Sequence, residues 1–201
     1  MLKAFYWPVL IVLGSLTGAV AAEVDSKYVE IGKKGVEASH RGDLMTAMTQ
    51  LQQAAEQGYA PAQVELAYLL DKADYNEQAF HWYQQAAQLG DAAGQFGLAS
   101  LYASGEGVGK DLEQARELFE QSVQQKHYPA LYVVAQALEK GGMGFELDPR
   151  RALELYRECH AGGERGCTER LARAYSKGEL GLAIDRDKAM EIRGSLEKSE
   201  K

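Results

Sequence analysis

The sequence has 201 residues, of which 22 are Lys or Arg and 29 are Asp or Glu, so its formal net charge is −7. This acidic balance argues against a nucleic-acid-binding protein, because phosphate backbones select clustered Lys and Arg side chains. It favours a basic partner, although a charge of this size also simply keeps a domain in solution. The length suits one cooperative domain of stacked repeats.

Residues 1–22 have the layout of a cleavable secretory signal. One Lys precedes an apolar run over residues 4–13, and small residues follow. We expect cleavage near Ala21 or Ala22, export to the periplasm or the exterior, and no membrane insertion after cleavage. The alternative is an uncleaved anchor, but the run falls short of the roughly 20 residues that a spanning helix needs, and it contains Pro8. No Cys follows it as a lipid attachment site.

A two-helix unit then recurs five times along the chain. A small alanine marks each unit at spacings of 32, 36, 37 and 37 residues: Ala47, Ala79, Ala115, Ala152 and Ala189. An Asp suited to capping the second helix lies four residues earlier in every unit except the second: Asp43, Asp111, Asp148 and Asp185. Such a period indicates stacked helical repeats, with approximate units 27–57, 58–89, 90–125, 126–162 and 163–201.

The third unit shows the pattern most clearly. Its first helix has apolar residues three and four positions apart, as expected for one helix face: Phe96, Leu98, Ala99, Leu101 and Tyr102. Glycines in residues 105–111 end this helix, and the next helix is apolar along one side. A single hairpin of this kind cannot bury both faces, so it needs neighbours.

These residues resemble the Sel1-like repeat (SLR) family, a branch of the tetratricopeptide-type helical repeats. The resemblance is carried by AAEQGYAPAQ at residues 54–63, WYQQAA at 82–87 and GEGV at 105–108. The first unit is closer to the tetratricopeptide pattern, and the second lacks the glycine turn. The resemblance implies an all-α fold, a right-handed solenoid of about five antiparallel helix pairs. It also implies a protein-binding scaffold without catalytic activity or cofactor.

Cys159 and Cys167 are the two cysteines, and we expect a disulfide because exported proteins meet oxidising conditions. The alternative is a reactive or metal-binding thiol pair, which neither a Cys-x-x-Cys spacing nor an adjacent His pattern supports. This junction also resembles the secreted cysteine-rich Hcp proteins, which join successive hairpins at the same eight-residue separation but do so in most repeats. Closing so short a loop is expected to add about 2.5 kcal/mol to the free energy of unfolding in the chain-entropy model.

The sequence contains no recognisable catalytic or metal site. Residues 105–110 superficially resemble a phosphate-binding loop, but Ser104 stands in place of the first glycine, Asp111 replaces Ser or Thr, and a helix precedes the loop. The histidines have no metal-ligand spacing: His40, His81, His127 and His160. No nucleophile has an evident base.

By resemblance to the family, the first helix of each unit lines a concave surface. The predicted partner-binding residues form two rows: Val64, Phe96, Tyr132 and Glu169, then Tyr68, Ser100, Gln136 and Arg173. Asp71, Ala103, Glu139 and Ser176 are expected along the rim. An apolar strip with polar flanks is typical of an interaction site; the alternative is that these aromatic side chains pack between repeats.

Other large side chains are predicted to form the core. Trp82 and Tyr83 fit a core between repeats better than a ligand cage. Six more are expected to be buried outright: Leu66, Leu98, Leu118, Phe119, Leu155 and Tyr156.

Three functions remain compatible with these features. The leading hypothesis is a non-enzymatic, exported scaffold that binds a protein or peptide in its groove. The second is an immunity protein that neutralises an envelope-targeted toxin or effector, for which a small acidic protein is suited. The third is an Hcp-like, β-lactam-interacting protein, which ranks last because no catalytic constellation is present.

Overall fold

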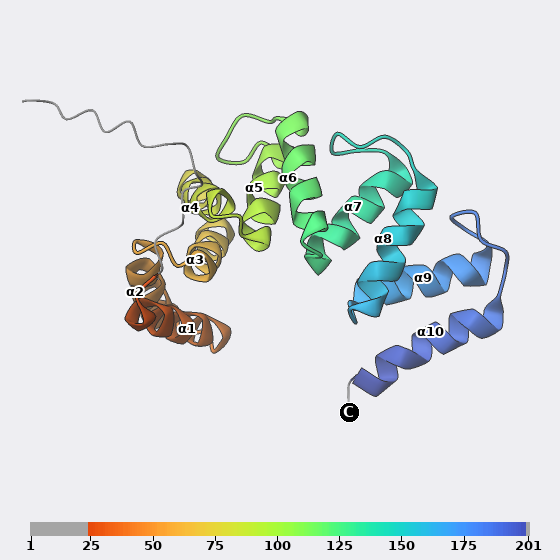
Figure 1. Cartoon of the computed structure of the whole chain (residues 1–201), viewed down its shortest axis with the longest axis horizontal. Coiled ribbons are helices and arrows are strands. Elements are labelled where there is room, and N and C mark those ends of the chain that lie inside the picture. Colours follow the sequence, from red (N-terminus) through yellow and green to blue (C-terminus); the bar gives the residue numbers. More distant parts are fainter. Residues whose placement is uncertain (1–23, 200–201) are drawn as a thin grey trace, which may run out of the picture.

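Ten helices follow one another along a curved array in the computed structural model, which describes residues 24–199 (Figure 1). The first helices of the five units are α1 (Ser26–His40), α3 (Ala60–Lys72), α5 (Ala92–Ser104), α7 (Tyr128–Lys140) and α9 (Arg165–Lys177). The second helices are α2 (Leu44–Ala55), α4 (Asn76–Gln88), α6 (Leu112–Gln124), α8 (Pro149–Ala161) and α10 (Arg186–Ser199). The predicted all-α solenoid is confirmed. The predicted signal segment lies outside the described residues.

The predicted aspartates cap the second helices. The side chains of Asp43 and Asp148 each accept a hydrogen bond from a backbone N–H of the following first turn, and Asp111 and Asp185 do the same. These bonds satisfy amides that have no partner within the helix. In the second unit Tyr75 precedes α4 without a side-chain cap, and Asp74 adopts the left-handed backbone conformation at φ 62°.

The recurring alanines are buried in the packed core of the array. Ala47, Ala79, Ala115 and Ala152 are fully buried, and Ala189 is 3% exposed. An alanine takes little space, so the two helices of one unit approach closely and each unit can stack on the next. The sequence period therefore reflects one buried alanine contact in each repeat.

The core consists of clusters arranged along the array rather than around one centre. One cluster joins the first three units and includes Leu51, Leu66 and Leu98. A second joins the third, fourth and fifth units around Phe119 and Tyr156. A small third cluster, around Leu171 and Ile192, holds α10 in place.

Most of the predicted core is buried, with one correction. Leu66, Leu98, Phe119, Leu155 and Tyr156 are at most 7% exposed. Leu118 is only partly buried, because it lies where the first two clusters meet and packs against the side of both.

The array curves toward its first helices over the first three units. α1 contacts α3, and α3 contacts α5, whereas the second helices of successive units make no comparable contact. Side chains that point from α3 and α5 into this inner face therefore converge. Further along, the predicted disulfide joins Cys159 of α8 to Cys167 of α9, with 5.8 Å between the two Cα atoms.

Candidate functional site

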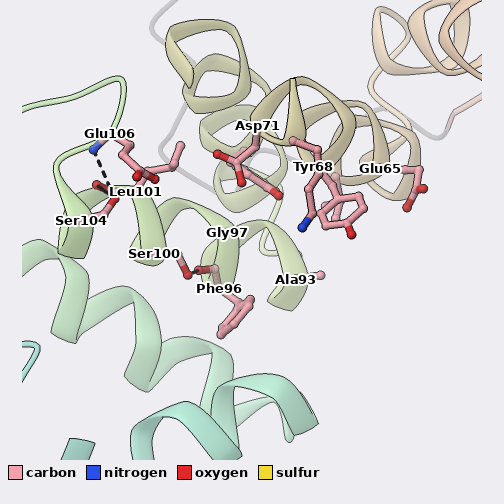
Figure 2. Close-up of a pocket in the computed structure, with 13 residues that line it drawn as sticks. Glu65, Tyr68, Asp71, Ala93, Phe96, Gly97, Ser100, Leu101, Ser104 and Glu106 are labelled. Carbon is pink, nitrogen blue, oxygen red and sulfur yellow. Dashed lines mark hydrogen bonds between the residues drawn. The ribbon is translucent and has the colours of Figure 1, made fainter. Parts of the chain in front are cut away.

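A cavity of about 600 Å³ opens between α3 and α5. Figure 2 shows Tyr68 and Asp71 on α3 across from Ser100 on α5, with Glu106 in the turn that follows α5. Two kinds of side chain dominate its lining: the aromatic Tyr68, Tyr83 and Phe96, and the acidic Glu65, Asp71 and Glu106. The cavity thus offers aromatic faces surrounded by negative charge.

Tyr83 reaches this cavity from α4 by crossing over Gly97 of α5. A Cβ atom on Gly97 would lie 2.3 Å from Cε1 of Tyr83, so only glycine leaves room for the ring. Tyr83 is 6% exposed, and its hydroxyl has no hydrogen-bond partner among residues 24–199. Burial, followed by the charges of Asp71 and Glu65, raises the pKa of Tyr83 above its usual value. The hydroxyl therefore remains a protonated donor at the edge of the cavity.

Two carboxylates of the cavity lack any ion-pair or hydrogen-bond partner among residues 24–199. Glu65 accepts a hydrogen bond from the Ser39 hydroxyl at 2.5 Å, but no described residue forms an ion pair or hydrogen bond with the carboxylate of Asp71 or Glu106. Burial first, and then repulsion by Glu106, raises the pKa of Asp71. The ammonium of Lys72 instead lies 5.6 Å from the centre of the Tyr68 ring.

A second cavity, of about 370 Å³, lies between α7 and α9. Here Arg170 bridges two carboxylates. Its Nε and Nη2 bond both oxygens of Glu139, with Nε 2.9 Å from Oε2, and its Nη1 lies 2.9 Å from Oε2 of Glu179. The Tyr156 hydroxyl donates to Glu139 at 2.9 Å. Glu139 thus accepts three hydrogen bonds from Arg170 and Tyr156, whereas Nη1 of Arg170 and Oε2 of Glu179 form an ion pair without a hydrogen bond.

The ion-pair network determines the charge states around this second cavity. The hydrogen bond from Arg170 lowers the pKa of Glu139, and this effect exceeds the opposing effect of burial. Burial and the neighbouring Glu139 raise the pKa of Tyr156. Only 13% of the Arg170 side chain is exposed, and its guanidinium lies 5.7 Å from the centre of the Tyr156 ring. Arg170 is therefore a structural cation rather than a free one.

The eight predicted partner-binding residues divide equally between the two cavities. Val64, Tyr68, Phe96 and Ser100 line the cavity between α3 and α5. Tyr132, Gln136, Glu169 and Arg173 line the cavity between α7 and α9. Phe96 also contacts Phe119 and His127, with ring centres 5.8 and 5.4 Å apart, so it has a packing role as well.

The four predicted rim residues occupy different environments. Asp71 lines the first cavity, and Glu139 lines the second, where it also belongs to the ion-pair network. Ala103 packs partly against the core. The hydroxyl of Ser176 donates to the backbone carbonyl of Arg173.

Sequence analysis missed Tyr83 and Glu106 in the first cavity and Arg170 in the second. Tyr83 is assigned to the core by its apolar neighbours, and it is indeed buried, yet it also lines the cavity. Gly97 is the signal that could have revealed it, because a glycine inside an apolar helix indicates close approach by another group.

Among residues 24–199, no three His, Cys, Asp or Glu side chains gather to hold a metal ion. Within the same range, no helix combines the length and apolar character needed to cross a bilayer.

Comparison with protein-family models matches the Sel1 repeat to residues 60–91, 92–127, 129–158 and 167–191, more than half of the chain. The chain belongs to the Sel1 repeat family. Sel1 repeat proteins are generally scaffolds that mediate protein–protein interactions. The matches begin at α3, so the pair α1–α2 lies outside them.

Solved Sel1 repeat structures share this fold. A Sel1 repeat protein from Oxalobacter formigenes superposes with a TM-score of 0.77 at 24% identity, over 84% of this chain and 70% of its own. A protective antigen present in uropathogenic Escherichia coli strains, which displays an SLR fold, gives a TM-score of 0.66 at 29% identity, over 87% of this chain and 39% of its own.

A curated relative is an uncharacterized protein of Neisseria meningitidis serogroup B. It is 30% identical over 129 residues, which amount to 64% of this chain. The chain spans 27% of the length of that relative.

Proposed function

We propose that this Sel1 repeat protein is an exported, non-enzymatic scaffold that holds a protein or peptide partner against the inner face formed by its first helices. The observation that carries the proposal is the pair of cavities between α3 and α5 and between α7 and α9. Both open between first helices, and together they contain all eight residues that the repeat pattern selects. Partially exposed aromatic side chains such as Tyr68 are typical anchors for a partner.

Export is supported by two features. The disulfide between Cys159 and Cys167 belongs to an oxidising compartment, and residues 1–22 have the layout of a secretory signal. The expected location is the periplasm or the exterior. Fractionation of cells that carry a C-terminally tagged chain tests this location, and a tag found with the cytosolic fraction would contradict it.

Affinity capture from the exported fraction tests partner binding. Tyr68→Ala removes an anchor that is 46% exposed, and Arg173→Ala removes an exposed cation of the other cavity. Matched controls are Tyr75→Ala, at a tyrosine that is 58% exposed outside both cavities, and Arg150→Ala, at an exposed arginine of α8. We expect the first pair to lose a partner that the second pair retains.

Exposed side chains are chosen because Phe96→Ala and Tyr132→Ala would also disturb packing. Circular dichroism must report the same helicity and melting temperature for the variants and the wild type. An identical set of captured proteins for all four variants would place binding on another face.

A second candidate is an immunity protein that blocks a basic, envelope-targeted effector. The acidic lining of the first cavity and the net charge of −7 favour it. Co-expression with an exported effector encoded beside this gene is the test. Protection that depends on Tyr68 would support immunity, and unaltered killing would contradict it.

A further inference from the structure

The two cavities are equivalent places in the repeat. Asp71 and Glu139 are each the twelfth residue of their helices, α3 and α7. Tyr83 and Tyr156 are each the eighth residue of the helices that follow, α4 and α8. The correspondence is by position along each helix, so it does not depend on the cavities themselves.

The carboxylates that follow α5 and α9 also occupy equivalent positions in the repeat. Glu106 and Glu179 each lie two residues beyond the end of a first helix, α5 and α9. Both follow a left-handed glycine, at φ 87° for Gly105 and φ 69° for Gly178. Two carboxylates and one buried tyrosine therefore occupy the same three positions of the repeat in both places. Asp71, Glu106 and Tyr83 all line the first cavity, whereas Glu139 and Tyr156 line the second and Glu179 lies behind Arg170 as its ion-pair partner.

Two positions that hold cations in the second set lack them in the first. The sixth residue of α9 is Arg170, which hydrogen-bonds Glu139, forms an ion pair with Glu179 and lies beside Tyr156. The ninth is the exposed Arg173, which lies 3.4 Å from Glu179. The corresponding residues of α5 are Gly97, which has no side chain, and Ser100. Asp71, Glu106 and the Tyr83 hydroxyl are consequently left without the cation that contacts their counterparts.

We propose that the cavity between α3 and α5 is a receptor for an arginine side chain of the partner protein, whose guanidinium takes the place that Arg170 occupies in the equivalent cavity. The proposal rests on the proposed function and names the chemistry of the partner. The cavity has room, at about 600 Å³ against about 370 Å³ where Arg170 is present. Within the described chain, Lys72 is its one lining cation, and that ammonium lies over Tyr68 rather than against a carboxylate.

The arrangement selects a guanidinium over an ammonium. Arg170 forms a two-bond contact with Glu139 while a third nitrogen reaches Glu179. A planar fork of five N–H donors can do this, whereas the compact ammonium of Lys cannot span the same groups. The faces of Tyr68 and Phe96 add a surface on which a guanidinium stacks.

The test uses the purified protein and the peptide acetyl-Gly-Ser-Arg-Ser-Gly-amide, followed by ¹H–¹⁵N chemical-shift titration. Saturable shifts are expected at the amides of Gly97, Ser100 and Ser104. Citrulline has the shape of arginine without its charge, so the citrulline peptide should bind about tenfold more weakly. The affinity of the lysine peptide should lie between those of the arginine and citrulline peptides. Equal affinity for the arginine and citrulline peptides would overturn the proposal.

Variants give an independent check. Asp71→Asn combined with Glu106→Gln should weaken the arginine peptide about tenfold, because it removes both charge-assisted contacts. Glu117→Gln combined with Glu154→Gln makes the same change in net charge at exposed positions of α6 and α8, and it should leave binding within about twofold. Unchanged binding by the first pair, or shifts confined to α7 and α9, would overturn the proposal.

The experiments distinguish failure of the arginine-receptor proposal from failure of the proposed scaffold function. If the natural partner is lost with Tyr68→Ala but kept with Asp71→Asn and Glu106→Gln, the scaffold function stands and the arginine receptor is wrong. If the peptide binds as expected but no variant changes the captured proteins, the cavity is an arginine site and the scaffold proposal is wrong.

Discussion

The cavity between α7 and α9 contains its own cation, whereas the equivalent cavity between α3 and α5 does not. Glu139, Glu179 and Tyr156 surround Arg170 in the first case. Asp71, Glu106 and Tyr83 surround an open space next to Gly97 in the second. Arginine in place of Gly97, together with Arg173 in place of Ser100, thus separates an ion-paired structural network from a site with unpaired carboxylates.

The junctions beside the two cavities differ in the same region of the repeat. Cys159 and Cys167 join α8 to α9 covalently. The matching positions between α4 and α5 are Ala86 and Gly94, which are so close that a Cβ atom on Gly94 would lie 2.5 Å from that of Ala86. The terminal pair has a neighbour on one side only, and the bond compensates for that smaller buried interface.

The largest expected effect comes from removing Arg170, the partly buried cation of the second cavity. Arg170→Ala leaves the partly buried Glu139 without its charged partner, and it should lower the free energy of unfolding by about 3 kcal/mol. Urea denaturation measures this change. The control Arg150→Ala alters an exposed arginine of α8 and should stay within about 0.5 kcal/mol of the wild type. Equal stability of the two variants would show that Arg170 is not a structural cation.

The second effect concerns the disulfide. Cys159→Ala combined with Cys167→Ala should lower the free energy of unfolding by about 2.5 kcal/mol. Reduction of the wild type should reproduce most of this loss, since the sequence contains no other cysteine. Alkylation of the unreduced, exported protein should find no free thiol. Two labelled cysteines would contradict the bond.

The third effect is a pair of opposite pKa shifts in the two cavities. The pKa of Glu139 is lowered by Arg170, so its stabilising contribution is present above the usual range of Glu and is lost as the pH falls through that lowered value. The pKa of Asp71 is raised, so its unfavourable charge is present above that raised value and is relieved as the pH falls.

Asp71 should therefore titrate above the usual pKa of Asp, and Glu139 below the usual pKa of Glu. Carboxyl ¹³C NMR measures both, and Asp71→Asn assigns its signal. Two unshifted pKa values would mean that the two cavities do not differ electrostatically.

The smallest expected effect concerns Lys72, the lysine that lines the cavity between α3 and α5. Lys72→Met removes a cation that lies near the acidic cavity, so affinity for the arginine peptide should rise about twofold. Lys140 is the corresponding last residue of α7, and Lys140→Met should leave that affinity unchanged. A loss of affinity with Lys72→Met would show that Lys72 takes part in binding.

Residue types and spacing predicted the repeat well because each signal is local or periodic. The aspartate caps bond amides two or three residues away, and Ala47 and its counterparts recur once per unit. The rows through Val64 and Tyr68 follow from the same period. By contrast, Leu118 is partly exposed and Glu139 is ion-paired, since both outcomes depend on side chains of other units.

Five stacked helix pairs, and the side chains that share a helix face, could be predicted from residue types and spacing, since helical spacing and capping are properties of neighbouring residues. That these faces form two cavities, one with its own arginine and one without, follows only from how distant helices pack. Arg170 and Glu139 are 31 residues apart in sequence and meet only because α7 and α9 come together. Gly97 leaves an open cavity only because three other segments bring Tyr83, Asp71 and Glu106 to the same place.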